Sequence, residues 1–433
     1  MRTTMSKTFL VADNSLFIPV ARALARAGNR VLYHNLGWQQ GFPKLEAGVI
    51  GDGLPDIECV PDIWEVKDEV DCFVFPDIQA AGLQCELRAQ GKRVWGSAKG
   101  QTIENDRLFF LQKLEELGLD VPPYTPVKGL TNLRLFLKDK EDIWIKMSKW
   151  RGSFETKHFR NMDVDSGLLD NWAVRFGGLQ DVLTFICFPK IDTKIELGAD
   201  TYCIDGQWPS LMLHGIEAKD EAYFSAVTKR EDMPEQRLPI MEAFSPYLKE
   251  TQYRCQWSME VRVNDEGNFF IDPTCRGGLP STGSQCLALD NLADIIYEGA
   301  DGNLVEPKYN CRFTAEAMVK IHGEINAWNT MELTPKLREH LQMSGYCMVG
   351  DKPWFPPEAG VVEDEIGWLV ATGDTPTATL ELLNALADEL PDGCSASVES
   401  VADVVREIEA MKDEGIKLTD AVMPEADIVL ENS

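Results

Sequence analysis

The segment Trp257–Gly278, which reads WSMEVRVNDEGNFFIDPTCRGG, predicts an antiparallel hairpin. Its first part alternates apolar and polar residues as a half-buried strand does, and 264–267 is a cluster of turn-forming residues. A second strand, 268–272, follows the turn. Pairing through the turn places opposed residues on one face of the sheet. We therefore expect the carboxylates of Glu260 and Asp272 to lie at the same end of that face.

Two further polar residues follow the second acid at alternate positions, Thr274 and Arg276. Magnesium ions bind carboxylate and phosphate oxygens, and a guanidinium binds phosphate. The pattern therefore indicates a magnesium–nucleotide site. An ordinary hairpin with scattered surface acids is the alternative that the residues alone leave open.

The order acid, spacer, acid, polar residue and arginine is similar to the metal-binding hairpin of the ATP-grasp superfamily, which includes biotin carboxylase, D-alanine ligase and glycinamide ribonucleotide synthetase. The resemblance implies that Glu260, Asp272 and Thr274 bind the metal. The usual second half of the hairpin is Glu-x-Asn-x-Arg, whereas this chain has Asp272-Pro273-Thr274-Cys275-Arg276. The second acid is therefore shorter than usual, and a hydroxyl replaces an amide.

Other features occur around the hairpin in the order of the superfamily. The segment 96–99 (GSAK) precedes a helix at 108–118, Lys146 ends an apolar strand before the loop 147–156, and the apolar strand 183–188 precedes a connector at 189–193. In the superfamily such a connector holds adenine, and an acid near it, here Glu196, often holds the ribose. The residues that the resemblance assigns to ATP are Arg107, Lys146, Lys149, Arg151, Gly152, Ser153, Lys190, Ile191 and Glu196.

Two of these positions depart from the superfamily. Arg107 stands where a phosphate-contacting lysine is usual, and arginine keeps the charge. The loop has Gly152 as its one glycine, so we expect side chains to replace backbone amides at the phosphates. The resemblance implies catalytic roles for Lys146, which neutralises phosphate charge with Arg107, and for Arg276, which stabilises the phosphoryl group in transfer.

Two segments are candidates for binding the acceptor substrate, and each also has a purely structural interpretation. The loop 276–285 (RGGLPSTGSQ) is rich in amides and hydroxyls, and its attachment to the hairpin indicates a role in binding the acceptor, although such loops also simply turn. The charges at Glu217, Lys219, Lys229 and Arg230 are of the type that holds a carboxylate or phosphate. A solvated surface explains these charges equally well.

The N-terminal region predicts a small doubly wound domain. Apolar runs at Thr8–Asp13 and Arg30–Asn35 flank a helical pattern at 16–27, and a second unit follows with strands at 71–75 and 93–95. The turn after the first strand reads Ala-Asp-Asn-Ser and lacks the glycine fingerprint of a nicotinamide dinucleotide site.

The C-terminal region contains a separate pattern that resembles a known domain. The strand 365–371 followed by Gly373-Asp374-Thr375 and a helix through Leu390 resembles the small C-terminal domain of glycinamide ribonucleotide synthetase. The fold class that the resemblance implies is α/β and α+β, an ATP-grasp fold with an N-terminal doubly wound domain and a small C-terminal α+β domain. The expected boundaries are 1–100 for the Rossmann-like domain, 101–300 for the ATP-grasp domain with a lid at about 125–195, and 301–433 for the C-terminal domain with its linker helices and acidic tail.

The amino-acid composition limits which binding partners and which cellular compartment are expected. The 433 residues are 44% hydrophobic, enough for a packed core, and the net charge of −28 argues against nucleic acid and anionic membranes as partners. Eleven scattered cysteines without a CxxC pair, and a start without a long apolar core, predict free thiols in the cytoplasm. No apolar run approaches the roughly 20 residues of a membrane span, and the five dispersed histidines give no support for a zinc site.

Within the superfamily, the likeness is greatest to glycinamide ribonucleotide synthetase (phosphoribosylamine–glycine ligase). It implies an ATP-dependent ligase of the EC 6.3 type, a monomer or homodimer, that joins a small-molecule carboxylate to an amine through an acyl phosphate. ATP and Mg²⁺ or Mn²⁺ are the implied cofactors. The N-terminal glycine-rich turn with Arg-Glu-His of that enzyme is absent here, so its substrates do not carry over. Two alternatives stay open: a nucleotide-binding protein without ligase turnover, and a carboxylase-like enzyme that uses bicarbonate.

Overall fold

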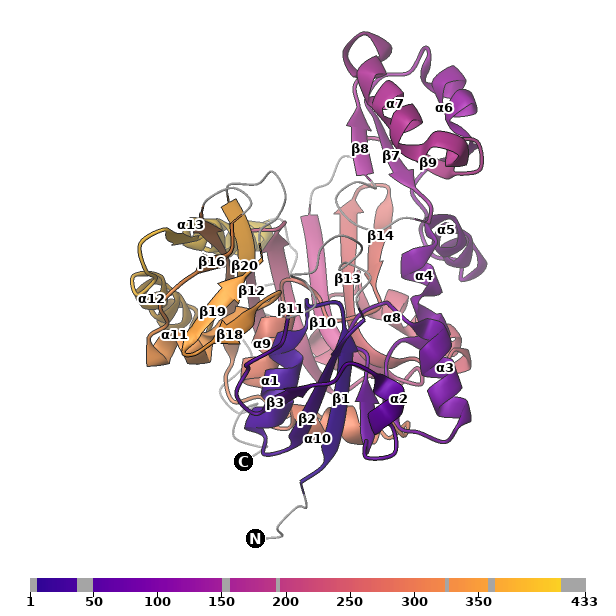
Figure 1. The fold of residues 1–433 in the computed structure, drawn as a ribbon. Coiled ribbons are helices and arrows are strands. Elements are labelled where there is room, and N and C mark those ends of the chain that lie inside the picture. Colours follow the sequence, from indigo (N-terminus) through magenta and orange to yellow (C-terminus); the bar gives the residue numbers. More distant parts are fainter. Residues whose placement is uncertain are drawn as a thin grey trace.

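The structure is a computed structural model that describes residues 6–36, 50–149, 156–191, 195–323, 327–356 and 363–413. Figure 1 shows three main layers of sheet. A parallel N-terminal sheet lies at the base, a large antiparallel sheet rises behind it, and a small sheet with two helices stands apart at the top. The candidate site lies where the last two sheets approach each other.

The N-terminal sheet confirms the predicted doubly wound arrangement. Its five strands are parallel in the order β3-β2-β1-β4-β5. The apolar runs form its central strands because both of their faces are buried, as in parallel sheets generally. The helix after β1 begins two residues later than the pattern predicts, since Pro19 lies in its first turn. The elements are β1 (Thr8–Asp13), α1 (Ile18–Arg26), β2 (Arg30–Asn35), β3 (Ile57–Cys59), α2 (Ile63–Val66), β4 (Cys72–Val74), α3 (Ala81–Ala89) and β5 (Val94–Trp95).

The large sheet has nine strands, in the order β14-β13-β10-β11-β12-β15-β20-β17, with β21 paired to β15. It joins strands from both sides of residue 300, because β12 pairs directly with β15. Its strands are β10 (Ile195–Ile204), β11 (Leu211–Ala218), β12 (Ala222–Lys229), β13 (Arg254–Asn264), β14 (Gly267–Thr274), β15 (Phe313–His322), β17 (Leu341–Met343), β20 (Glu363–Gly373) and β21 (Cys394–Ala396).

The charges at Glu217, Lys219 and Arg230 are exposed, as the solvated-surface alternative expects, but the segment 211–229 that carries most of them is largely buried. It forms β11 and β12, two strands near the middle of the large sheet, and most of their side chains are buried. Glu217 and Lys219 lie at the end of β11 and in the turn after it, so their charges reach solvent while the strands themselves are core.

The small sheet packs against two helices and has a core of its own. Its strand order is β6-β9-β7-β8, and its buried side chains include Ile145, Phe185 and Trp172. The elements are β6 (Thr125–Lys128), α6 (Leu130–Leu137), β7 (Ile143–Met147), β8 (Thr156–Phe159), α7 (Met162–Phe176) and β9 (Thr184–Pro189). In Figure 1 this unit lies above the end of the β13–β14 hairpin.

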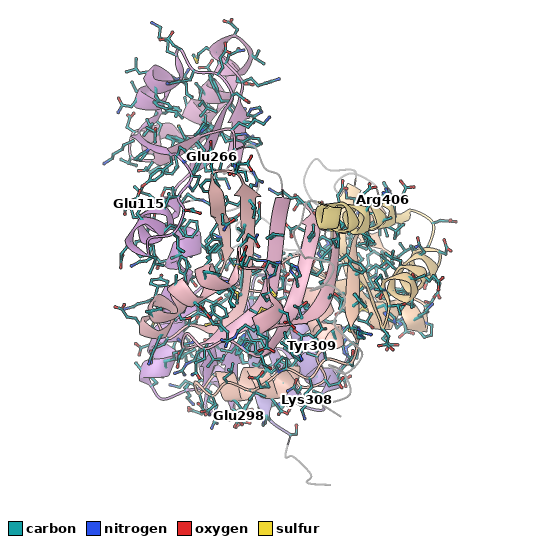
Figure 2. The ribbon with its side chains drawn as sticks, turned by 180° about the vertical axis from the view of Figure 1, so that it is seen from behind. Glu115, Glu266, Glu298, Lys308, Tyr309 and Arg406 are labelled. Atoms are coloured by element: carbon teal, nitrogen blue, oxygen red, sulfur yellow. The ribbon has the colours of Figure 1, made fainter. Side chains whose placement is uncertain are left out.

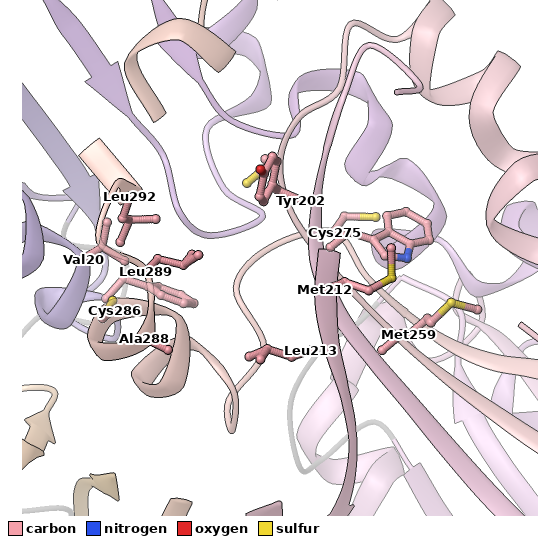
Figure 3. Packing of buried hydrophobic residues seen from close by; sticks show 14 of the residues in the cluster. Val20, Tyr202, Met212, Leu213, Met259, Cys275, Cys286, Ala288, Leu289 and Leu292 are labelled. Atoms are coloured by element: carbon pink, nitrogen blue, oxygen red, sulfur yellow. The ribbon is translucent and has the colours of Figure 1, made fainter. Parts of the chain in front are cut away.

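The remaining elements cover the large sheet and connect it to the others. Figure 3 shows how closely they pack, with Cys286, Leu289 and Leu292 gathered around Val20 of α1. These elements are α4 (Thr102–Asn105), α5 (Arg107–Glu116), α8 (Leu238–Glu250), α9 (Thr282–Ala288), α10 (Leu292–Gly299), α11 (Pro335–His340), α12 (Pro376–Ala387), α13 (Val398–Asp413), and a three-stranded sheet of β16 (Asn329–Thr330), β18 (Cys347–Val349) and β19 (Lys352–Phe355).

Two expectations about the whole chain can be compared with this architecture. All eleven cysteines are free thiols, and most of them are buried. Among the described residues, no helix combines the length and the hydropathy that crossing a bilayer requires.

Candidate functional site

The predicted hairpin forms from β13 and β14. Glu260 lies directly opposite Asp272, and Ser258 lies opposite Thr274, with a register shift between Glu260 and Val261. Thr274 is the last residue of β14, so the second strand extends two residues beyond the predicted end. The turn forms as expected, because the side-chain oxygen of Asn264 accepts from the backbone N–H groups of residues 266 and 267. Seen from behind in Figure 2, Glu266 marks the hairpin tip, below the small sheet.

Each of the two hairpin acids has an arginine beside it. Arg107, the first residue of α5, donates from Nη2 to Asp272 Oδ1 at 3.0 Å and from Nη1 to the carbonyl oxygen of Ile271 at 2.6 Å. Arg262 lies two residues along β13 from Glu260, and its Nη2 is 3.3 Å from Glu260 Oε1. Arg107 is only 3% exposed, so its charge is buried against the hairpin. The sequence analysis missed Arg262, although its alternate spacing on the strand was the available signal.

Arg276 lies where the hairpin leaves the large sheet and meets two buried acids. Its Nε donates to Glu104 Oε1 at 3.0 Å and lies 3.7 Å from Asp77 Oδ1. The other oxygen of Glu104 accepts from the backbone N–H of Cys275 at 2.5 Å. Burial raises the pKa of Asp77, and the charge of Arg276 opposes that rise. This cluster ties α4 and the end of β4 to the hairpin, and no local sequence pattern pointed to it.

A second acidic position lies at the carboxyl end of β1. Asp13 is fully buried and accepts from the backbone N–H of Phe17 and from the Tyr33 hydroxyl, both at 2.5 Å. Burial raises the pKa of Asp13 to about 6. The strand order reverses between β1 and β4, which is where ligands of open parallel sheets usually bind. The loop after the hairpin reaches this edge, because the Gly277 N–H donates to the carbonyl oxygen of Pro76 at 3.2 Å.

Lys146 lies on the small sheet and is opposed by Thr156 on β8 and Ile186 on β9. Ile186 belongs to the main core of the protein, whereas Ile145 packs with α6 and α7 in the separate core. Because neighbours along a strand point to opposite faces, Lys146 lies on the face turned toward the body of the molecule. Lys149 is 77% exposed, and its Nζ lies 3.3 Å from Asp106 Oδ2.

The end of β7 is joined to the beginning of α5 through Ser148. Its carbonyl oxygen accepts from the Arg107 N–H at 2.8 Å, and its hydroxyl donates to Asp106 Oδ1 at 2.7 Å. The same hydroxyl accepts from the Leu108 N–H at 3.0 Å. The strand that carries Lys146 is therefore fixed to the helix whose first side chain holds Asp272.

The structure describes only some of the other residues that are predicted to bind the nucleotide. Lys190 and Ile191 follow β9 directly, as predicted for the connector. Glu196 lies in β10 opposite Arg262, and its side chain lies outside what the structure describes. Arg151, Gly152 and Ser153 also lie outside the described residues.

Comparison with solved structures identifies the fold. A phosphoribosylamine–glycine ligase from Thermotoga maritima superposes with a TM-score of 0.64, covering 90% of this chain and 98% of that chain at 13% identity. The biotin carboxylase domain of the Hydrogenobacter thermophilus 2-oxoglutarate carboxylase, a dimer in complex with MgADP, ADP and bicarbonate, gives 0.59, covering 91% and 92% at 12% identity. An L-amino acid ligase from Bacillus licheniformis gives 0.57, covering 90% and 99% at 15% identity. This chain has the ATP-grasp fold.

Sequence comparison adds no closer relative. No protein-family model matches the chain, and no curated protein matches its sequence. At 12–15% identity the solved structures establish the ATP-grasp fold, while the activity depends on this chain's own residues.

The donor set of the ATP-grasp hairpin fits a divalent cation that is shared with a nucleotide. Glu260 and Asp272 supply two carboxylates from adjacent strands, and no group of three or more His, Cys, Asp or Glu residues that could hold a metal occurs among the described residues. Magnesium is typically held by one or two carboxylates together with substrate phosphates. The hairpin therefore matches a metal that enters with ATP better than one held by the protein alone.

The loop 276–285 does not offer an open row of hydroxyls in this ATP-grasp fold. Ser281, Thr282 and Ser284 are buried, and Ser281 donates to Asp200 Oδ1 at 2.6 Å. Tyr223 donates to the other oxygen of Asp200, also at 2.6 Å. Its ring lies across Gly215, where an added Cβ would come within 2.5 Å of it. The Ser281 hydroxyl thus holds the loop against the large sheet, and the Thr282 hydroxyl donates within the loop to the carbonyl oxygen of Gly278 at 2.7 Å.

A second buried carboxyl lies under α9. Glu316 Oε1 accepts from the Ser284 N–H at 2.6 Å, and burial raises the pKa of Glu316 to about 7. Glu316 and Asp200 anchor the two ends of the segment 281–284 to the large sheet. Sequence reasoning missed both acids, because each lies in an otherwise apolar or mixed strand with no motif around it.

Proposed function

We propose that this protein is an ATP-dependent ligase that joins a small-molecule carboxylate to an amine through an acyl phosphate. The observation that carries the proposal is the cross-strand pair Glu260–Asp272 with the buried guanidinium of Arg107 against it. The likeness of the fold to a phosphoribosylamine–glycine ligase and an L-amino acid ligase supports carbon–nitrogen bond formation.

The reaction depends on positioning and charge neutralisation rather than on a protein nucleophile. Glu260, Asp272 and Thr274 hold the divalent cation, Mg²⁺ or Mn²⁺, which when bound neutralises the phosphates and polarises the transferred phosphoryl group. Lys146 neutralises phosphate charge from the face of the small sheet that is turned toward the body. Arg276, held in place by Glu104, stabilises the phosphoryl group as it moves from ATP to the carboxylate substrate.

The remaining nucleotide contacts belong to the same proposal. Lys190 and Ile191 contact adenine from the connector after β9, and Glu196 holds the ribose. The loop after β7 covers the phosphates with Lys149, Arg151, Gly152 and Ser153. Before any ligand arrives, Lys149 pairs with Asp106, so the loop's beginning is already drawn toward α5.

In this proposal the acceptor amine binds at the edge of the N-terminal sheet. That edge is formed by Asp13 and Asp77, and the loop that begins at Gly277 lies on it. Buried acids there disfavour a phosphate group, which agrees with the missing glycine-rich turn and argues against phosphoribosylamine. The division into domains at 1–100, 101–300 and 301–433, a cytoplasmic location, and a monomeric or dimeric state stay predictions.

A carboxylase-like reaction with bicarbonate is the second candidate. It is favoured by the superposition on the biotin carboxylase domain whose structure contains MgADP and bicarbonate. The same nucleotide residues would serve it, and bicarbonate would take the place of the carboxylate substrate.

The test is Mg²⁺-dependent release of ADP under three sets of acceptors. The first set is glycine with freshly generated phosphoribosylamine, each omitted in turn. The second is a panel of amino acids and amines in pairs, and the third is bicarbonate with an amine. ADP release that requires one carboxylate and one amine, with a product of their summed mass minus water, supports the ligase. Release that requires bicarbonate supports the second candidate, and nucleotide binding without release under any set contradicts both.

A further inference from the structure

The contact of Arg107 with the hairpin has no complete role in the proposed reaction. Its guanidinium binds two successive residues of β14, the carbonyl oxygen of Ile271 and the carboxylate of Asp272. A guanidinium stays protonated at all physiological pH values. One of the two carboxylates of the hairpin therefore has a permanent positive charge 3.0 Å from its Oδ1.

Arg107 is held in this position from both its side chain and its backbone. The backbone N–H donates to the Ser148 carbonyl oxygen at 2.8 Å, and Asp106 caps the same helix by accepting from the Phe109 N–H at 3.3 Å. Moving the guanidinium away from Asp272 would also break its 2.6 Å hydrogen bond to Ile271. With only 3% of its surface exposed, the side chain has little room for another position.

We infer that Arg107 supplies a fixed positive charge in the place of a second metal ion, so that the hairpin binds one divalent cation per nucleotide. The inference rests on the proposed function, since it requires a nucleotide at the hairpin. Two cations in one phosphate-transfer site lie roughly 3.5–4 Å apart and both need carboxylate oxygens. A cation on Asp272 Oδ1 would lie next to a like charge whose side chain is buried and is also bonded to Ile271.

The other donors of the hairpin agree with a single cation. Thr274 offers a neutral hydroxyl, which binds magnesium more weakly than a carboxylate does, and the hydroxyl of the residue opposite it, Ser258, interacts with the buried Asp200. Glu260 lies on the neighbouring strand, and its arginine neighbour Arg262 is more than a third exposed, whereas the arginine beside Asp272 is buried. The cation is therefore expected nearer to Glu260, with the guanidinium on the Asp272 side contributing the remaining positive charge.

The first measurement is the number of Mn²⁺ ions bound per chain, counted by electron paramagnetic resonance of free Mn²⁺. The full-length protein is titrated with Mn²⁺ at a saturating concentration of a non-hydrolysable ATP analogue, after correction for Mn²⁺ bound by the free analogue. We expect one Mn²⁺ per bound nucleotide. Two tight Mn²⁺ ions per bound nucleotide would overturn the inference and leave the proposed function intact. No binding of the analogue at any Mn²⁺ concentration would overturn both.

The second measurement tests whether Arg107 sets this number. In Arg107→Gln the fixed charge is removed, and we expect a second Mn²⁺ to bind at least tenfold more tightly than any second ion in the wild-type protein. Arg107→Lys keeps the charge and is expected to stay at one ion. Arg134→Gln is the matched control, because Arg134 forms an exposed 2.7 Å pair with Asp170 on the helices of the small sheet, away from the hairpin. If Arg107→Gln folds and still binds one ion, the inference is wrong; if it does not fold, the wild-type count alone decides.

Discussion

Asp272 of β14 lies directly opposite Glu260 of β13, and the same carboxylate accepts a 3.0 Å hydrogen bond from the buried Arg107. Asp272 therefore joins the β13–β14 hairpin to α5. Through Ser148, α5 is in turn bonded to the end of β7, the strand that carries Lys146. A change at Asp272 affects charge at the centre of the site while the backbone around it stays fixed by other bonds.

Asp272→Asn is expected to lower ATP turnover about 100-fold or more, because the amide keeps the shape and loses the charge that a cation needs. The variant should fold but lose about 1–3 kcal/mol of the free energy of unfolding, since the buried Arg107 keeps its bond to Ile271 and loses the charge of its carboxylate partner. ADP release and thermal unfolding of the variant measure both effects. Asp170→Asn, which removes an exposed paired carboxylate elsewhere, should leave turnover unchanged. Turnover of Asp272→Asn within a few-fold of the wild type would contradict the metal assignment.

Lys146→Met is expected to weaken ATP binding roughly tenfold or more, because a charge-assisted bond to a phosphate contributes about 1.5–3 kcal/mol. Lys157→Met is the matched control. Lys157 lies opposite Ile145 on the neighbouring strand, so it belongs to the other face of the same small sheet. Titration with a fluorescent ATP analogue compares the two variants. Equal loss of affinity in both would show that sheet charge in general, rather than the position of Lys146, determines binding.

Arg276→Gln is expected to lower both stability and turnover. It leaves the buried Glu104 without its 3.0 Å partner, which costs about 3 kcal/mol of the free energy of unfolding. The double variant Arg276→Gln, Glu104→Gln also removes the buried charge of Glu104 and should recover most of the stability. Its turnover should stay low if Arg276 also acts on the phosphoryl group. Denaturant unfolding and ADP release separate the two roles, and a double variant with restored turnover would make Arg276 a structural residue only.

Glu316 is expected to make the protein less stable as pH rises from about 5 to above 7. Burial raises its pKa from an ordinary 4.5 to about 7, so between these values the folded state keeps a proton that the unfolded state has lost. The stabilisation is therefore fully present below pH 4.5 and is lost as pH rises through 7, by about 3 kcal/mol. Glu316→Gln should remove this loss, and denaturant unfolding of both proteins at pH 5 and pH 7.5 measures it. Asp13 changes stability in the same direction in both proteins, so the comparison isolates Glu316. If the wild type and Glu316→Gln lose the same free energy of unfolding between pH 5 and pH 7.5, the prediction is wrong.

Local patterns predicted the elements that are amphipathic or bounded by clear turns. The apolar run Thr8–Asp13 forms β1 with the predicted ends. The turn after Asn264 forms as predicted, but the register that starts there would pair Glu260 with Ile271, and the irregularity between Glu260 and Val261 brings Glu260 opposite Asp272. Strands β11 and β12 escaped prediction, because they are buried on both faces and so do not alternate, while the charges beside their turn dominate the local sequence.

The partners of the site residues were harder to predict than the residues themselves. The pair Glu104–Arg276 and the pair Arg107–Asp272 each join positions more than 150 residues apart in the chain, so no spacing rule reveals them. The loop after Arg276 illustrates a second limit. Small hydroxyl residues suit both anion-binding loops and tightly packed turns, and here Ser281 donates to a buried acid.

The direct pairing of β12 with β15 has a consequence for how this protein can be divided. Residues 222–226 of β12 pair with residues 313–317 of β15. The C-terminal third of the chain therefore supplies strands of the large sheet and is not a separate appended domain. A fragment ending near residue 300 would present β12 as a bare, apolar edge strand, and such edges recruit other chains. We expect such a fragment to aggregate or to fail to fold. Any shortening, fusion or exchange of parts should cut elsewhere, for example at the small upper sheet, which brings its own core.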